Sequence, residues 1–402
     1  MNYAKLTIPA IKILSKLIHV KNAPLIEGEN SILRIVNYCK LNGFNKALIV
    51  TAPFLTANNK LNHLFDKLRS ANIEFCVFDK IETEPTFNLC EEVRHTAKEE
   101  NVDLIVAVGG GSVLDLCKVV CAGVVDDKPL TKFAGILKIK KQPLPLFAVP
   151  TTAGTGSETT FIAVITDSLG QKRTVISPKI VPTLAVLDSN LLVNMPAKLT
   201  ASTGIDALSH AIESYVSTQT TDGHDFYAPT AVSLIFKNLK KCVDEPENKV
   251  ARQKMLKASY LAGVSMNKEM VGYAHAFAHQ LGSFYHIPHG EAIAMVLVKV
   301  LRFERENCQS KLAQLGVAIG LDESLGEELL SKLFVEKVAN LIREVGLQQY
   351  CKQVEKKDYE QIVNNAFKET AFRYPVCKFM SKEDAFKFLD RLDEEEINLW
   401  DW

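Results

Sequence analysis

One stretch of the chain decides the fold: Val102–Ala122 reads VDLIVAVGGGSVLDLCKVVCA. Its apolar first part predicts a buried strand over Val102–Val108, and its second part predicts a helix over Ser112–Ala122. Three glycines join the two, so the backbone can come close to an anion at the helix start, where the dipole favours negative charge. The turn is neither the GxGxxG fingerprint nor a P-loop, so by itself it indicates either a phosphate cradle or a structural turn.

Strands and helices alternate around this stretch from about residue 46 to about residue 190. Continuous apolar runs predict the strands, and amphipathic segments between them predict the helices. Such an alternation favours a parallel sheet covered by helices on both faces, with Thr86 as a candidate N-cap. The other predicted strands are Lys46–Thr51, Ile73–Phe78, Leu146–Val149, Phe161–Thr166 and Leu184–Leu187, and the other predicted helices are Thr56–Ser70 and Thr86–Glu100.

The pattern changes after Pro196, where strand-like runs give way to helix-length periodic segments. We therefore expect an α/β domain with a parallel sheet over residues 1–195 and an all-helical domain over residues 196–402. The helices expected in the second domain include Leu199–Val216, Ala228–Lys241, Ala251–Ser265, Glu291–Glu306 and Gly326–Val345.

The first twenty residues form a separate N-terminal arm, residues 1–20, with Lys5, Lys12 and Lys16 among apolar residues. The arm lacks the small-residue cleavage site of a signal peptide. A basic amphipathic helix can lie on a membrane surface, but we expect an arm that packs on its own protein.

Composition excludes several classes of partner. The 402 residues carry 47 Lys plus Arg and 47 Asp plus Glu, so the net charge is zero and offers no general attraction to nucleic acid. No run approaches the roughly 18 apolar residues of a membrane span, so we expect no integral membrane segment. The nine cysteines include no CxxC pair, which is typical of reduced thiols and favours a cytoplasmic protein.

Four of the nine histidines lie in residues 272–290, GYAHAFAHQLGSFYHIPHG. His275 and His279 are four apart, so on a helix their imidazoles share one face. Pro288 cannot continue that helix, so His289 returns from a second segment. Neutral imidazole is a common zinc ligand and suits iron(II), although each histidine taken alone is more often an ordinary core or surface residue.

A second cluster supplies a carboxylate. Asp206 and His210 are four apart in a stretch with helical periodicity. One carboxylate with three imidazoles would suit iron(II) or zinc and leave a position open for a substrate oxygen. The alternative for Asp206 is an ordinary carboxylate on a helix surface.

A third motif is the polar loop VPTTAGTGSE, residues 149–158. It places hydroxyls at Thr151, Thr152, Thr155 and Ser157 between small residues, where they could bind a ribose or pyrophosphate. The alternative is a polar turn between two strands.

The four motifs stand in one order: GGGSVLD (109–115), PTTAGTGSE (150–158), GIDALSHAIE (204–213) and HAFAHQLGSFYHIPHG (275–290). In this combination the chain, from about Pro24 onward, resembles the iron-dependent, group III alcohol dehydrogenases. The resemblance implies an N-terminal dinucleotide-binding domain, a C-terminal helical metal-binding domain and a site in the cleft between them. It also implies reversible hydride transfer between an alcohol and NAD or NADP, giving an aldehyde or ketone, in an enzyme that commonly forms a homodimer.

The resemblance assigns roles residue by residue. It places the ligands of a divalent metal, iron(II) or zinc, on Asp206, His210, His275 and His289, and it makes His279 a catalytic histidine close to the nicotinamide that does not bind the metal. The residues that match its cofactor-binding positions are Gly109, Gly110, Gly111, Ser112, Asp115, Thr151, Thr152 and Thr155.

The chain departs from the family pattern at two places. NAD-using members usually carry Asp after the strand that ends at Thr51, whereas this chain has Ala52, which removes a repulsion against the 2′-phosphate of NADP. A lysine usual after Asp167 is replaced by Arg173, with Lys172 beside it.

Two alternative functions remain at this stage. Glycerol dehydrogenases and dehydroquinate synthases share the two-domain plan, often with zinc and fewer protein ligands, but the full set of one Asp and three His favours the alcohol dehydrogenases. A non-catalytic nucleotide-binding protein would not need a complete set of metal ligands.

Overall fold

The computed structural model describes residues 21–82, 84–218 and 226–395. The predicted N-terminal arm, residues 1–20, lies outside the described residues. The chain divides after Val193 into two compact units, near the boundary predicted at Pro196.

The N-terminal unit is built on a six-stranded sheet in which every pair of neighbouring strands is parallel, as predicted. The strands β4 and β6 lie at its centre and all their residues are buried, which explains their continuous apolar sequences. In spatial order the strands are β1 (Leu25–Glu27), β9 (Leu184–Leu187), β6 (Leu146–Pro150), β4 (Leu104–Gly109), β2 (Lys46–Thr51) and β3 (Glu74–Phe78).

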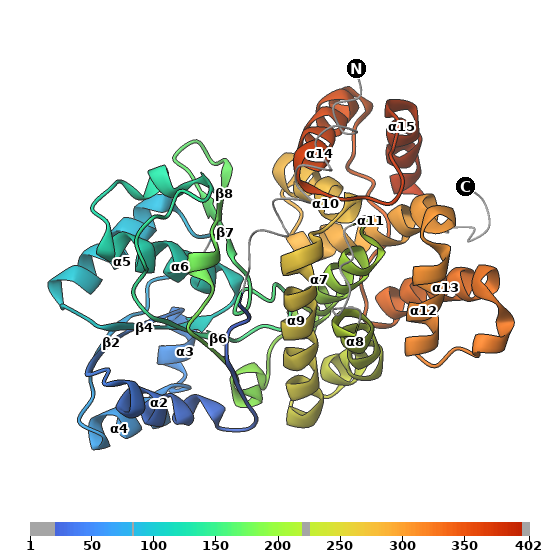
Figure 1. Cartoon of the computed structure of the whole chain (residues 1–402). Helices are drawn as coiled ribbons and strands as arrows, with labels where there is room; N and C mark the ends of the chain where they lie inside the picture. The colour runs from blue at the N-terminus through green and yellow to red at the C-terminus, as the bar shows by residue number, and fades with distance from the viewer. Residues whose placement is uncertain (1–20, 83, 219–225, 396–402) are drawn as a thin grey trace. The chain divides into compact units, whose positions relative to one another are not determined.

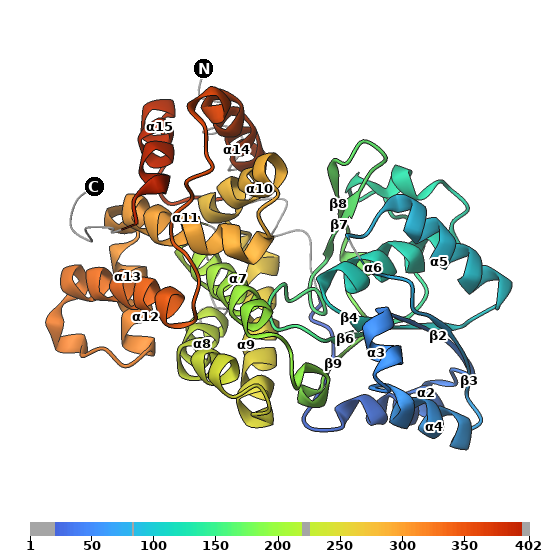
Figure 2. The same ribbon diagram turned by 180° about the vertical axis from the view of Figure 1, so that it is seen from behind.

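Helices cover both faces of this sheet. Figures 1 and 2 show α5 (Phe87–Glu99) and α6 (Gly111–Val125) on one face, and α2 (Ile35–Asn42) and α4 (Asn62–Ser70) on the other. The cap predicted for α5 is confirmed, because the Thr86 side chain accepts a hydrogen bond from the Leu89 N–H. Short 3-10 turns complete this unit: Ser31–Arg34, Leu130–Phe133, Pro178–Ile180 and Ser189–Leu192.

The single helix predicted over Thr56–Ser70 was wrong. The chain instead forms a short helix α3 (Pro53–Ala57), then a turn, and then α4. Asn59 lies in this turn with φ of 55°, in the left-handed region that asparagine tolerates better than most residues and that ends a right-handed helix.

The strand predicted over 161–166 is present but belongs to a second, smaller sheet. There β7 (Ile162–Thr166) pairs antiparallel with β8 (Lys172–Ile176), which pairs in parallel with β5 (Gly135–Ile136). Alternate residues of β7 are buried, as expected of a strand with one covered face.

All the secondary-structure elements formed by the described residues of the C-terminal unit are helices or 3-10 turns, as predicted. Helices α7, α8 and α9 pack together, α11 packs on α7 and α10, and α14 packs on α10. The helices are α7 (Ala197–Val216), α8 (Tyr227–Asp244), α9 (Lys249–Glu269), α10 (Tyr273–Tyr285), α11 (His289–Glu304), α12 (Gln309–Ala318), α13 (Glu327–Glu344), α14 (Tyr359–Arg373) and α15 (Lys382–Asp390), with 3-10 turns at Arg305–Asn307, Glu323–Leu325, Lys356–Asp358 and Arg391–Asp393. None of the helices formed by the described residues is long and apolar enough to cross a membrane.

Candidate functional site

Helix α7 contributes two of the predicted ligands. Asp206 and His210 lie one turn apart and are both buried, with 3% and 6% of their surfaces exposed. The N-terminus of α11 approaches α7 so closely that a Cβ at Gly290 would lie 2.3 Å from the Ser202 carbonyl oxygen. This close approach places His289, the first residue of α11, beside Asp206.

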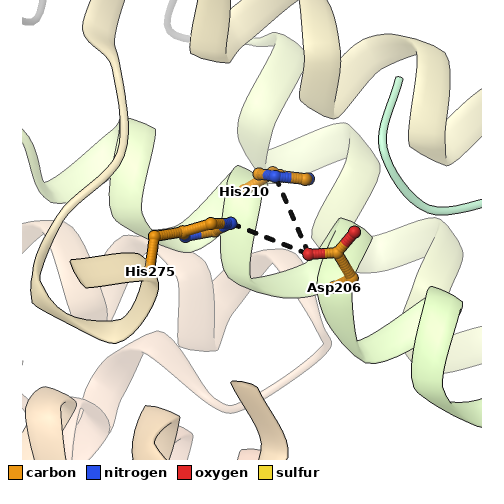
Figure 3. A group of neighbouring side chains, drawn as sticks. All are labelled: Asp206, His210 and His275. Atoms are coloured by element: carbon orange, nitrogen blue, oxygen red, sulfur yellow. Dashed lines mark ion pairs between the residues drawn. The ribbon is translucent and has the colours of Figure 1, made fainter. Parts of the chain in front are cut away.

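Three imidazoles converge on one carboxylate oxygen. The Asp206 Oδ1 atom lies 3.3 Å from His289 Nε2, 3.7 Å from His275 Nε2 and 3.8 Å from His210 Nε2. The two longer distances exceed those of hydrogen bonds. Two atoms bound to one tetrahedral metal ion, each about 2.1 Å from it, lie about 3.4 Å apart. Figure 3 shows Asp206 and the rings of His210 and His275, which stack with centroids 4.6 Å apart.

The donor atoms of this cluster fit a metal ion. Within the described residues, Asp206 Oδ1 and His275 Nε2 are buried and have no hydrogen-bond partner. Buried polar atoms of this kind are costly unless something binds them. Asp206, His210 and His275 offer ligand atoms within 4.8 Å of one another, and nitrogen and carboxylate donors suit iron(II) and zinc.

The electrostatics of the cluster also suit a cation. Burial lowers the pKa of His210 to about 4, so its imidazole is neutral and able to act as a ligand. Burial alone would raise the pKa of Asp206, but the surrounding imidazoles hold it well below its usual range, so the carboxylate is charged. Burial alone would lower the pKa of His275, but the charges of Glu213 and Asp206 raise it to about 9, so a metal ion that binds this ring must displace a proton from it.

Glu213 is a buried carboxylate that the sequence interpretation missed. Its Oε2 lies 2.5 Å from His275 Nδ1, and its Oε1 accepts a hydrogen bond of 2.7 Å from the Ala274 N–H. A signal was present, because Glu213 follows His210 by three residues and Asp206 by seven, which places all three on one face of α7.

His279 lies beside the cluster and has a partner of its own. Its Nδ1 lies 2.7 Å from Glu369 Oε1, which also accepts a hydrogen bond of 2.6 Å from the Tyr374 hydroxyl. The ring of His279 stacks on that of His289 with centroids 5.2 Å apart. No sequence pattern links Glu369 to His279, since 90 residues separate them.

In the N-terminal unit the two loop motifs come together because β4 and β6 are neighbouring parallel strands, with Gly109 opposite Pro150. A Cβ at Gly111 would lie 2.9 Å from Thr155 Oγ1, and one at Gly110 would lie 3.5 Å from Thr152 Oγ1. The Thr151 N–H donates to the Gly109 carbonyl at 3.0 Å. The threonine hydroxyls therefore lie against the glycine turn at the start of α6, where backbone amides favour an anion.

The sheet order adds a second reason to place a nucleotide here. From β2 the chain moves outward to β3 and then returns to the other side of β2 as β4, so the strand order reverses between β2 and β4. Ligands of open α/β sheets bind beyond the carboxyl ends of the strands at such a reversal. The glycine turn follows β4, and Ala52 follows β2.

Asp115 is held by the protein's own groups. Its Oδ1 accepts a hydrogen bond of 2.5 Å from Ser157 Oγ, and its Oδ2 accepts one of 2.9 Å from the Val164 N–H. The buried Lys118 ammonium donates to Ser157 Oγ at 2.8 Å and to the Ile162 carbonyl at 2.7 Å. The sequence interpretation missed Lys118, which ties the polar loop to helix α6.

The two positions that depart from the family pattern, Ala52 and Arg173, both lie in the described residues. Ala52 is the N-cap residue of α3 and is partly exposed. Asp79, the residue after β3, accepts a hydrogen bond of 2.7 Å from Thr56 Oγ1 on α3. Arg173 pairs with Asp167 at 2.6 Å.

Comparison with known proteins gives matches over both units. Residues 23–189 match the family profile described as iron-containing alcohol dehydrogenase. Residues 200–392 match the profile of the C-terminal part of the Fe-containing alcohol dehydrogenase family. Together the two matches cover most of the chain.

Individual relatives agree with these profiles. The chain is 33% identical over 347 residues to alcohol dehydrogenase 4 of Schizosaccharomyces pombe, in a match that covers 85% of this chain and 81% of that protein. It is 34% identical over 354 residues to the NAD-dependent methanol dehydrogenase of Bacillus methanolicus, covering 85% and 91%. A solved 1,3-propanediol oxidoreductase superposes with a TM-score of 0.88 at 31% identity, covering 93% of this chain and 100% of that one.

Proposed function

We propose that the buried cluster of ligand-type side chains binds one divalent cation in this chain, which belongs to the iron-containing alcohol dehydrogenase family. The chain is a metal-dependent, NAD-linked alcohol dehydrogenase, an oxidoreductase that interconverts an alcohol with its aldehyde or ketone. The proposed ligands are Asp206, His210, His275 and His289. The observation that carries the assignment is the approach of three imidazole Nε2 atoms to the single Asp206 Oδ1 atom.

Iron(II) is the proposed cation, and zinc is the alternative. A donor set of three nitrogens and one oxygen accepts both. When bound, a cation of this kind is a Lewis acid that makes an alcohol hydroxyl easier to deprotonate and polarises a carbonyl.

The ligand side chains have distinct tasks in this proposal. The Asp206 carboxylate supplies negative charge that offsets one of the two positive charges, and the His210 imidazole binds in its neutral form. His289 has 36% of its side chain exposed, so the substrate oxygen would enter on its side of the cluster.

His279 is the proposed catalytic residue that carries a proton. The Glu369 carboxylate would accept a hydrogen bond from Nδ1–H, which leaves Nε2 as the nitrogen able to accept or release a proton. The Tyr374 hydroxyl fixes Glu369 by donating to the same carboxylate oxygen. His279 would then exchange the hydroxyl proton of the substrate with solvent, to which 35% of its side chain is exposed.

The nucleotide is proposed to bind at the glycine turn and the polar loop of the N-terminal unit. The nicotinamide supplies the hydride chemistry, and the protein binds and orients the cofactor. Both NAD and NADP are proposed as substrates, because Ala52 offers no carboxylate to repel a 2′-phosphate. The proposed contacts are Gly109, Gly110, Gly111, Ser112, Asp115, Thr151, Thr152 and Thr155, and the support for them is the packing of the threonine loop on the glycine turn.

We further propose a cytoplasmic homodimer that acts on a small alcohol or aldehyde. All nine cysteines lie in the described residues and are free thiols, which suits a reducing compartment. Dimerisation is carried over from the family resemblance.

Two variants test the division of roles between the histidines. With iron(II) and a panel of small alcohols, His275→Ala should lose both bound metal and turnover, whereas His279→Ala should keep its metal but turn over more slowly with an altered pH profile. Elemental analysis and steady-state rates are the measurements. A His275→Ala protein that keeps stoichiometric metal, or a His279→Ala protein that loses it, would show that the assignment is wrong.

A further inference from the structure

We propose that Glu213 is a positioning residue that fixes the His275 ring with its Nε2 atom directed at the bound cation. This inference rests on the metal site proposed above and extends it to a side chain that does not bind the metal. The site would take the same divalent cation, and Glu213 would set the affinity of the site for it.

The contacts of Glu213 leave its carboxylate little freedom. The residue is buried, with 3% of its surface exposed, and its two oxygens are used by two different partners on α10. One partner is the backbone N–H of Ala274, the second residue of α10, which has no acceptor within its own helix. The other partner is the ring of His275, the next residue. A carboxylate at a helix N-terminus is also stabilised by the helix dipole.

The contact with His275 selects a tautomer. A carboxylate oxygen accepts hydrogen bonds, so this contact favours the tautomer in which His275 Nδ1 carries the hydrogen and donates a hydrogen bond to Glu213 Oε2. The lone pair for a metal is then on Nε2, the atom that lies 3.7 Å from Asp206 Oδ1. Carboxylates that hold the far nitrogen of a ligand histidine in this way raise its basicity and fix its ring orientation.

His210 provides the contrast within the same site. Its Nδ1 is buried and has no hydrogen-bond partner within the described residues. No side chain among the described residues therefore fixes its tautomer. Glu213 therefore controls one ligand ring, His275, rather than the cluster as a whole.

The backbone beside Glu213 is shaped to admit its carboxylate. A Cβ at Gly272 would lie 2.9 Å from Glu213 Oε1 and 3.3 Å from its Cδ. A methyl group at this position would push the carboxylate away from α10 without removing its charge. Gly272 therefore offers a second way to disturb the same contact.

The central experiment compares metal affinity, measured by competition with a chelator for zinc on the purified full chain without nucleotide or alcohol. In Glu213→Gln only one side-chain oxygen remains, so the amide cannot accept from both Ala274 and His275. If its NH₂ faces Nδ1, the imidazole must carry its proton on Nε2 instead, which blocks the metal. We expect zinc to bind 10- to 100-fold more weakly, the range typical of such outer partners.

The matched control is Glu304→Gln. Glu304 lies on α11 with 2% of its surface exposed, and burial raises its pKa well above its usual range, so this variant replaces a second buried carboxyl group that does not contact His275. We expect this variant to bind zinc as tightly as the unmodified chain. Glu213→Asp, which keeps two acceptor oxygens one methylene further away, should recover part of the affinity that Glu213→Gln loses.

A spectroscopic measurement separates positioning from a general loss of stability. With cobalt(II) as a probe, the visible absorption bands report the geometry of the ligands, and they should shift in Glu213→Gln but not in Glu304→Gln. If Glu213→Gln does not fold, Gly272→Ala replaces it and should weaken zinc binding in the same direction.

The outcomes are distinguishable. Zinc affinity and cobalt bands unchanged in Glu213→Gln, or unchanged in a folded Gly272→Ala when Glu213→Gln is unfolded, would overturn the role of Glu213. Absence of saturable binding of one ion by the unmodified chain would instead overturn the proposed metal site. Weakened binding in Glu213→Gln together with normal binding in Glu304→Gln supports the positioning role.

Discussion

Gly290→Ala should weaken metal binding by forcing two ligand-bearing helices apart. Gly290 is the second residue of α11 and faces the backbone of Ser202 on α7. A Cβ there would lie 2.3 Å from the Ser202 carbonyl oxygen and 2.7 Å from its carbonyl carbon, whereas real Cβ contacts essentially never fall below 3.0 Å. Because both obstacles are backbone atoms, no side chain can rotate away, and α11 must move by at least about 0.7 Å, which is 3.0 minus 2.3.

The consequence for the site follows from the neighbours of these two residues. His289 precedes Gly290 on α11, and Asp206 lies one turn after Ser202 on α7. If α11 moves by this amount along the line that joins His289 and Asp206, the distance from His289 Nε2 to Asp206 Oδ1 lengthens from 3.3 Å to about 4.0 Å. Metal ligand distances tolerate deviations of only about 0.2 Å. An overpacked contact of this kind costs about 1–3 kcal/mol, which corresponds to roughly 5- to 150-fold if it appears in metal binding.

The assay measures zinc affinity by chelator competition and the melting temperature with and without zinc. Gly290→Ala should bind zinc about 10- to 100-fold more weakly, within the range above, and should show a smaller rise in melting temperature on adding the metal. The control is Gly316→Ala on α12, another buried helical glycine of the same unit. Its Cβ would lie 3.2 Å from Leu321 Cδ1 and 3.4 Å from the Leu330 carbonyl oxygen, so only small shifts are needed.

Zinc binding by Gly290→Ala as tight as by the unmodified chain, with an equal rise in melting temperature on adding the metal, would refute this prediction. The close approach of α7 and α11 would then not determine the ligand geometry. Equal losses of affinity in Gly290→Ala and Gly316→Ala would also refute it, since they would trace the effect to general destabilisation.

Two further predictions concern the N-terminal unit. The unmodified enzyme should use NADP at a rate within about tenfold of its rate with NAD. Ala52→Asp should restore a preference for NAD, because a carboxylate that faces the 2′-phosphate of NADP repels it. Steady-state rates with both cofactors test this, and a thousandfold preference of the unmodified enzyme for NAD would contradict it. Burial raises the pKa of Glu158 from 4.5 to about 7, so the folded unit holds a proton that the unfolded chain releases, and stability is lost as the pH rises from about 4.5 to about 7. At pH 8 the pKa shift of Glu158 is worth about 3 kcal/mol of stability, so Glu158→Gln should melt several degrees higher than the unmodified chain. At pH 4.5 the two melting temperatures should be almost equal. A difference in melting temperature that does not depend on pH would contradict the raised pKa of Glu158.

The order of elements follows from local sequence. The apolar run of β4 and the glycines after it predict a strand, a turn and a helix because side-chain periodicity and backbone freedom act over a few residues. Thr86 is recognisable as a cap for the same reason, since its partner, the Leu89 N–H, is three residues away. The break in the helix predicted over Thr56–Ser70 was missed because a left-handed asparagine is tolerated but not required by the sequence.

The ligand types and their spacing were also readable from the sequence. Asp206 and His210 lie one turn apart on α7, and any helix there would place both on one face. The choice of His275 over His279 as a metal ligand came from the family resemblance, because the two share one face of α10 and helical spacing cannot separate them. That assignment stays a prediction.

Only the tertiary structure decided which distant groups meet. Glu213 lies 62 residues from His275, Glu369 lies 90 residues from His279, and Ser157 lies 42 residues from Asp115. These contacts depend on how helices and loops pack, and local propensities carry no information about packing between segments far apart in the chain. The sequence therefore determined which side chains are available for chemistry, and packing determined which partner fixes each of them.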